Sequence, residues 1–156
     1  MRRIRSLALI LALGAALTGC AGTVSMQPAE SANDPLCAEV SARLPGTVAG
    51  LDRRWTDAQA TGAWGEPAAV LLTCGVAPPG PTTLPCQEVG AVDWIIDESD
   101  APMYRFTTYG RTPAVQVYLD YDVVSGGEAL QALSPILEQL PKDAECVARE
   151  DATPAP

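Results

Sequence analysis

The sequence predicts an α+β domain with a four-stranded, mostly antiparallel sheet, one N-terminal and one C-terminal helix packed on one face, and two disulfides. Three observations support this fold class. Apolar residues recur at helical spacing near both ends of the domain, four strand-like runs lie between them, and four cysteines fall in the same stretch. The domain covers residues 34–148 of a chain of 156 residues, a length for which one domain is expected.

The first element is a short amphipathic helix over residues 35–44. Asp34 is a suitable N-cap, and Pro35 suits the first helical position because its missing N–H needs no partner there. Apolar residues then recur every four positions from Leu36 to Leu44 and stop at a Pro-Gly pair. The pattern therefore predicts one helix that begins and ends sharply.

Four strands are predicted after a loop or marginal helix over residues 46–67. They cover residues 68–76, 89–97, 104–109 and 114–123, and the last one alternates most regularly between apolar and polar side chains. A Gly-Arg-Thr-Pro loop of hairpin length joins the third strand to the fourth. We expect these two strands to pair and one face of the sheet to stay open to solvent.

The last elements are a C-terminal helix and a tail. Ser125 and Glu128 form a capping box, and leucines at helical spacing follow until residue 140. Pro135 interrupts this stripe, so we expect one kinked helix or two short ones. Residues 149–156 are rich in Ala, Thr and Pro and are predicted to be a disordered tail.

The first 19 residues are predicted to be an export signal. Three arginines precede an eleven-residue apolar stretch that ends in small residues. Eleven residues of helix rise only about 16 Å, roughly half of a hydrocarbon core of about 30 Å, so a permanent membrane span is not expected.

The run Leu17-Thr18-Gly19-Cys20 resembles the lipobox of bacterial lipoproteins, in which the cysteine is acylated and becomes the first mature residue. The resemblance implies that Cys20 carries a diacylglyceryl and palmitate-type anchor. The predicted location is therefore the outer face of the cytoplasmic membrane, with the lipid bilayer as a partner. Residues 20–33 are small and polar, which is typical of a flexible spacer between anchor and domain.

The four remaining cysteines are Cys37, Cys74, Cys86 and Cys146, an even number in a chain predicted to be exported. Two disulfides are expected, because disulfides persist outside the cytoplasm. Among three possible connectivities we favour Cys74 to Cys86, across a proline-rich loop, and Cys37 to Cys146, across the ends of the domain. A zinc site of four thiolates is the alternative, but the chain has no Cys-x-x-Cys pair.

The composition excludes several classes of function. The chain has no histidine and one lysine, so His-dependent triads and imidazole metal sites are absent. The formal net charge is -9, and removal of the signal leaves seven basic against 19 acidic residues, which disfavours nucleic acid as a partner. We predict no catalytic residue, no metal site and no cofactor, and therefore a protein that is not an enzyme.

Three residues are the candidates for recognition. Arg111 in the predicted hairpin turn offers a planar donor fork to a carboxylate or phosphate, with Tyr109 beside it. The simpler interpretation is a turn whose arginine pairs with a surface acid. Trp94 is the third candidate, either lining a ligand groove or packing in the core.

Two acidic clusters suggest an alternative function. Asp97 and Asp100 follow one predicted strand, and Asp120 and Asp122 end another. Such carboxylates are the groups that a calcium-dependent or carboxylate-based envelope enzyme uses. Neither cluster matches the twelve-residue calcium loop, and solvated turns explain both more simply.

Three separated segments carry a further resemblance. Residues 64–76, 92–94 and 106–115 together resemble the domain of unknown function 3515 family, a family of uncharacterised actinobacterial lipoproteins, and the similarity spans about residues 36–147. Nine arginines against one lysine agree with a GC-rich coding genome. The resemblance implies a cell-envelope lipoprotein of unknown biochemical role and supplies no catalytic residue. We therefore predict a non-enzymatic binding or interaction module that recognises an envelope protein or a cell-wall ligand.

Overall fold

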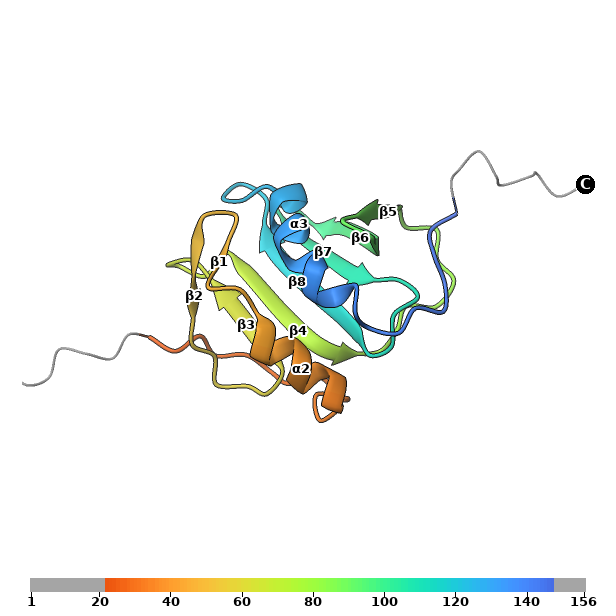
Figure 1. Ribbon diagram of the computed structural model, residues 1–156. Coiled ribbons are helices and arrows are strands. Elements are labelled where there is room, and N and C mark those ends of the chain that lie inside the picture. Colours follow the sequence, from red (N-terminus) through yellow and green to blue (C-terminus); the bar gives the residue numbers. More distant parts are fainter. Residues whose placement is uncertain (1–21, 148–156) are drawn as a thin grey trace, which may run out of the picture.

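The computed structural model describes residues 22–147, and within them two helices lie on one side of a single eight-stranded antiparallel sheet (Figure 1). The helices are α2 (Pro35–Arg43) and α3 (Gly126–Leu137). The strands are β1 (Thr47–Val48), β2 (Leu51–Arg54), β3 (Thr61–Trp64), β4 (Val70–Val76), β5 (Cys86–Val89), β6 (Val92–Asp100), β7 (Met103–Thr108) and β8 (Ala114–Asp120). The α+β class and the antiparallel sheet are confirmed, but the expected number of four strands is wrong.

The sheet has the strand order β1-β2-β3-β4-β8-β7-β6-β5. The predicted pairing of the third and fourth strands is confirmed as the β7–β8 hairpin, in which Phe106 lies opposite Val117. Strands β4 and β8 pair in the middle of the sheet although more than 30 residues separate them in the chain. The two edges are therefore built from β1 and β5.

Three of the extra strands come from residues 46–67, which we expected to be a loop or marginal helix. They are only two to four residues long, too short for an apolar period to be recognised. The fourth, β5, ends in a two-residue turn at Gly90 and Ala91, whose φ angles of 57° and 62° suit a tight hairpin. The predicted strand over residues 89–97 therefore combines the last residue of β5, the turn, and most of β6.

Both helix starts follow the sequence prediction. Asp34 Oδ1 accepts a hydrogen bond of 2.8 Å from the N–H of Leu36 and so caps α2, with Pro35 in the first position. Ser125 caps α3 through the N–H of Glu128. Pro135 lies inside α3, which continues to Leu137 as one helix rather than two.

The core fills the space between the helices and the sheet. Leu72 of β4 and Val117 of β8 lie opposite each other on this inner face and are fully buried, as are Leu130, Leu133 and Leu137 of α3. The opposite face, here called the open face, carries a row of more polar residues on neighbouring strands. In order across the sheet, this row is Thr73, Gln116, Thr107, Ile95 and Cys86.

The segment 22–33, which we expected to be a flexible spacer, instead contacts the domain. Val24 N–H donates to the carbonyl of Trp55 at 2.8 Å, and Ser31 N–H donates to the carbonyl of Gly75 at 3.1 Å. The carboxylate of Asp57 accepts from the N–H of Met26 and the hydroxyl of Ser25, both at 2.8 Å. The segment stays bound to the domain because these hydrogen bonds pair backbone N–H and C=O groups that would otherwise lack a partner.

All four predicted cysteines form disulfides, but the predicted pairing is wrong. Cys37 bonds to Cys74, and Cys86 bonds to Cys146, with Cα atoms 5.5 and 5.6 Å apart. Cys74 lies on β4 and Cys86 on β5, four strand intervals apart, or about 19 Å at the usual spacing. A disulfide spans no more than about 7 Å between Cα atoms, so the sheet itself forbids the pair that we favoured.

Three expectations concern residues outside the described part. These are the signal peptide over residues 1–19, the acylation of Cys20 and the tail over residues 149–156. They stay predictions. Neither helix between residues 22 and 147 is long and apolar enough to cross a membrane.

Candidate functional site

Arg111 neither offers an open donor fork nor pairs with a surface acid among the described residues, so both interpretations of it from the sequence are wrong. It is 5% exposed and lies at the C-terminal end of α3. Its Nη1 donates to the carbonyls of Glu138 and Leu140 at 2.7 and 2.6 Å, and its Nη2 donates to the carbonyl of Ala91 at 2.9 Å. A helix end leaves carbonyls without partners and carries partial negative charge, so a buried guanidinium is stabilised there. Both Nη atoms are thus engaged within the domain, and the buried guanidinium is not presented to a ligand in solvent.

Trp94 belongs to the core rather than to a ligand groove. It lies on β6 with a fully buried indole, on the inner face of the sheet. Its Nε1 has no hydrogen-bond partner among the described residues. Of its two possible roles, packing in the core is the one that the structure shows.

Tyr109 is half-buried and lines a hollow that we call the open-face groove. The groove has a volume of about 830 Å³ and is lined by residues 82–88 and 145–147 together with Asp93, Ile95 and Tyr109. Asp93 and Ile95 lie on the same face of β6 as Cys86 of β5, which places the groove on the open face at the β5 edge. It is a large hollow beside a residue that the sequence singled out.

One wall of the groove is the C-terminal segment, residues 141–147, which runs from the end of α3 to the open face. The N–H of Thr112 donates to the carbonyl of Pro141 at 3.3 Å, and the N–H of Asp143 donates to the carbonyl of Gly110 at 2.9 Å. Gly110 has a φ of 63°, and a Cβ there would lie 2.0 Å from the carbonyl oxygen of Ala144. Only glycine therefore allows the segment to pass so close to the hairpin.

An ion pair joins this wall to the buried Asp93 of β6. The Asp93 side chain is 2% exposed, its Oδ1 accepts from the N–H of Cys146 at 3.1 Å, and its Oδ2 lies 3.0 Å from Lys142 Nζ. Lys142 Nζ also lies 3.2 Å from Glu145. The hydrogen bond to Asp93, and after it the one to Glu145, raises the pKa of Lys142 above its ordinary value. The pair holds the lysine charged and positions the segment rather than activating a nucleophile.

Sequence reasoning missed Asp93 and Lys142. Asp93 interrupts an apolar run between Val92 and Trp94, which could have marked it as facing the opposite side of the strand. Lys142 is the single lysine of the chain. Their proximity depends on the path of the C-terminal segment, which no local pattern predicts.

The rim of the groove is apolar and acidic. Leu84 and Val147 are among the exposed large apolar residues, with Val147 78% exposed. Glu88 and Glu145, both exposed, add negative charge to the lining. The rim therefore combines exposed apolar side chains with negative charge.

The Asp97 to Asp100 cluster interacts with neighbouring side chains on the open face. Asp97 accepts from the N–H of Ser99 at 3.0 Å and forms an ion pair of 3.3 Å with Arg105. Ser99, and with a smaller effect Arg105, lowers the pKa of the Asp97 carboxyl. The Arg105 guanidinium lies 5.0 Å from the centre of the Tyr118 ring, and the Tyr118 hydroxyl donates to Asp100.

The second acidic cluster forms a turn. Asp120 Oδ1 accepts from the N–H of Asp122 at 3.0 Å. Within residues 22–147, no group of three or more His, Cys, Asp or Glu side chains is placed to hold a metal ion.

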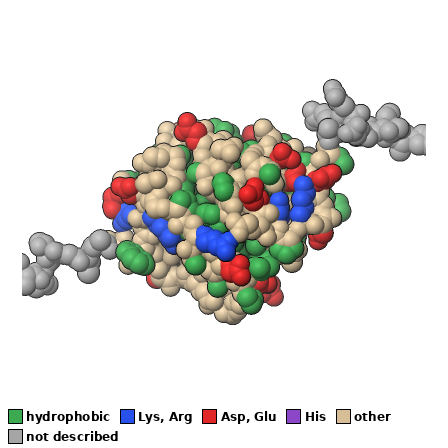
Figure 2. Space-filling view, viewed as in Figure 1, with side chains coloured by type: hydrophobic (Ala, Val, Ile, Leu, Met, Phe, Trp, Pro, Cys, Tyr) green, Lys and Arg blue, Asp and Glu red, His purple; other side chains and the backbone are tan. Residues whose placement is uncertain are grey.

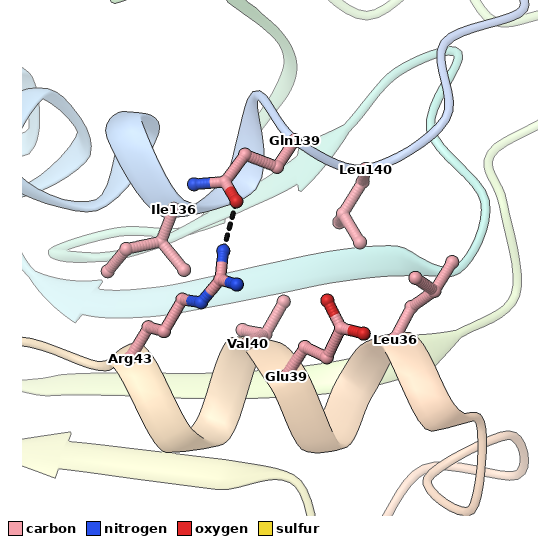
Figure 3. A pocket seen from close by; sticks show the side chains of 7 residues that line it. All are labelled: Leu36, Glu39, Val40, Arg43, Ile136, Gln139 and Leu140. Carbon is pink, nitrogen blue, oxygen red and sulfur yellow. Dashed lines mark hydrogen bonds between the residues drawn. The ribbon is translucent and has the colours of Figure 1, made fainter.

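The helix side offers less space. Figure 2 shows this side, where Lys and Arg side chains are spread over several places with acidic side chains close to most of them. Between α2 and α3 lies a cavity of about 20 Å³, where Arg43 reaches across to Gln139 (Figure 3). A cavity of this size holds about one water molecule and no ligand.

A family model described as "Protein of unknown function (DUF3515)" matches residues 6–145 of the chain. This match confirms the resemblance inferred from the three sequence segments. No curated protein and no solved structure gives a significant match.

Proposed function

The chain belongs to the DUF3515 family, whose function is unknown, and we propose that it is a lipoprotein anchored to the outer face of the cytoplasmic membrane. In this proposal Cys20 carries the acyl anchor, and the folded domain binds an envelope protein or a cell-wall ligand without catalysing a reaction. The proposal includes an actinobacterial source, as the arginine-rich, lysine-poor composition suggests.

The observation that carries the proposal is the way in which the chain uses its cysteines. The first cysteine, Cys20, follows an apolar stretch typical of an export signal and lies in a sequence that resembles a lipobox. The other four cysteines form two disulfides. Disulfides of this kind are typical of compartments outside the cytoplasm and rare within it. An anchored, extracytoplasmic domain accounts for all five cysteines at once.

The open-face groove supports the binding role. It is large enough for a short peptide or a few sugar rings, and its lining combines Tyr109 and Ile95 with acidic groups at the rim. The chain as a whole has 19 acidic against 10 basic residues, so a partner with basic groups is electrostatically favoured.

The anchor is tested by Cys20→Ala, with Thr18→Ala as a control that keeps a small residue in the cleavage region. Wild type and Thr18→Ala should incorporate labelled fatty acid and partition into detergent. Cys20→Ala should do neither. If Cys20→Ala still acquires the label and stays in the membrane fraction, the lipoprotein assignment is wrong.

The binding role is tested by placing a photo-activated crosslinker at Leu84, on the rim of the groove. The matched control position is Val123, which is also exposed but follows β8 at the end far from Tyr109. Crosslinking in intact cells should give an adduct from position 84 that is absent from position 123. Equal adducts at both positions, or none at either, would contradict binding in the groove.

A further inference from the structure

Trp55 is an unusual surface residue. It is 83% exposed, whereas Trp64 and Trp94, the other two tryptophans, are fully buried. A large aromatic side chain that is so exposed contributes little of the stabilising free energy that its burial would provide. Trp55 follows directly after β2 and is the most exposed of the large apolar residues between residues 22 and 147.

The start of the described chain is attached beside this tryptophan. The carbonyl of Trp55 accepts from the N–H of Val24 at 2.8 Å, and Arg54 Nη2 donates to the carbonyl of Gly22 at 2.7 Å. Val24 and Thr56 also form an isolated parallel β-bridge. The chain that leads back towards Cys20 is thus held against the residues on both sides of Trp55.

The covalent chain limits how far Cys20 can be from this place. Cys20 precedes Val24 by four residues, and an extended chain spans at most about 3.5 Å per residue. The Cα atoms of Cys20 and Val24 are therefore within about 14 Å of each other, whatever the path between them. An acyl anchor on Cys20 would bring a bilayer surface to the same part of the domain.

We propose that Trp55 is the membrane contact of the domain and lies at the headgroup level of the bilayer that holds the Cys20 anchor. This inference rests on the proposed lipidation of Cys20. Tryptophan suits this level because its ring is apolar and its N–H remains hydrated, which is why tryptophan is enriched at membrane–water interfaces. The segment 22–26 then acts as a short rigid connection and not as a tether that lets the domain drift.

The proposal also places the groove relative to the bilayer. Strands β2 and β5 are six intervals apart in the sheet, a path of about 29 Å along it. In Figure 1 the orange start of the described chain runs beside β2 and β3, and its blue end lies beyond β5 on the opposite side. A bilayer at Trp55 therefore lies near one edge of the sheet, and the open-face groove lies at the other.

The test uses the full lipidated protein in phosphatidylcholine vesicles made with or without brominated acyl chains, which quench tryptophan emission only at close range. Flotation first establishes that the protein is bound to the vesicles. Wild-type emission should then be lower in brominated vesicles. Trp55→Phe should lose this bromine-dependent quenching and keep its melting temperature, because only the two buried tryptophans remain.

A second variant moves the exposed tryptophan to the other end of the sheet. Trp55→Phe/Val147→Trp has an exposed indole beside the groove and should float with the vesicles without being quenched by bromine. If wild type floats but is quenched no more than Trp55→Phe, Trp55 does not contact the bilayer, although the anchor stands. If wild type does not float, the anchor and the contact are both wrong.

Discussion

The two disulfides stabilise regions of very different character. Cys37 and Cys74 join α2 to β4, and both are fully buried among the apolar side chains of the core. Cys86 and Cys146 join the first residue of β5 to the C-terminal segment and are both partly exposed. None of residues 141–147 is buried, so that segment depends on the disulfide and on polar contacts where the first region depends on packing. Removal of the first disulfide should therefore destabilise the whole domain, whereas removal of the second should mainly release the C-terminal segment.

The largest effect is expected for Cys37→Ala/Cys74→Ala. The disulfide closes a separation of 37 residues, which the chain-entropy model converts to about 4 kcal/mol of stability. Both sulfur atoms also fill buried space, so their loss weakens the core around them. Chemical denaturation should show one cooperative transition at lower denaturant. A loss below about 1 kcal/mol would mean that the core does not need this bond.

Arg111→Ala is expected to cost about 3 kcal/mol, because it leaves buried carbonyls at the end of α3 without donors. Arg43→Ala is the matched control. Arg43 is exposed, and its replacement should change the unfolding free energy by about 0.5 kcal/mol or less. Equal, small effects of the two replacements would show that Arg111 is solvated and would restore it as a recognition candidate.

Cys86→Ala/Cys146→Ala is expected to cost less, about 2 kcal/mol, because residues 141–147 can detach while the sheet and helices stay folded. Hydrogen exchange should speed up in that segment and remain slow in β4 and β8. Fast exchange throughout the sheet would contradict the local character of this region.

The smallest effect concerns the Lys142 ion pair. Because its contacts with Asp93 and Glu145 raise the pKa of Lys142, the stability they contribute is fully present below the unfolded value of 10.5. It is lost as the pH rises above 10.5 and through the higher pKa of the folded state. The difference in melting temperature between wild type and Lys142→Gln should narrow in that range. A difference that is constant from neutral to strongly alkaline pH would contradict this.

Local features of the fold could be predicted from sequence. The caps of α2 and α3 and the alternation of β8 depend on neighbouring residues, and the structure has them where the sequence indicates. Strands β1, β2 and β3 could not be recognised, because two to four residues are too few to show a period. They form by pairing with one another and, through β3, with β4.

The candidate site was less predictable because it depends on contacts between distant segments. From its neighbours in the sequence, Arg111 is predicted to be a turn residue. Its partner carbonyls come 27 and 29 residues later, and only the packing of α3 places them beside it. The disulfide pairing depends on strand order, which places β5 at the far edge from β1. Of the three predicted recognition residues, Tyr109 lines the open-face groove, Trp94 packs in the core, and Arg111 borders only a smaller hollow of about 210 Å³.

The contrast between a buried and a groove-side disulfide is tested most directly by a tryptic digest of unreduced protein. Cleavage after Arg54 and Arg105 leaves Cys74 and Cys86 on one peptide, residues 55–105. The structure predicts that this peptide is linked both to the peptide ending at Arg43 and to the peptide carrying Cys146.

A second cleavage before Leu84 should then separate two pairs, Cys37 with Cys74 and Cys86 with Cys146. Release of an unlinked 55–105 peptide with an internal disulfide would contradict the account. So would a pair that joins Cys37 to Cys86.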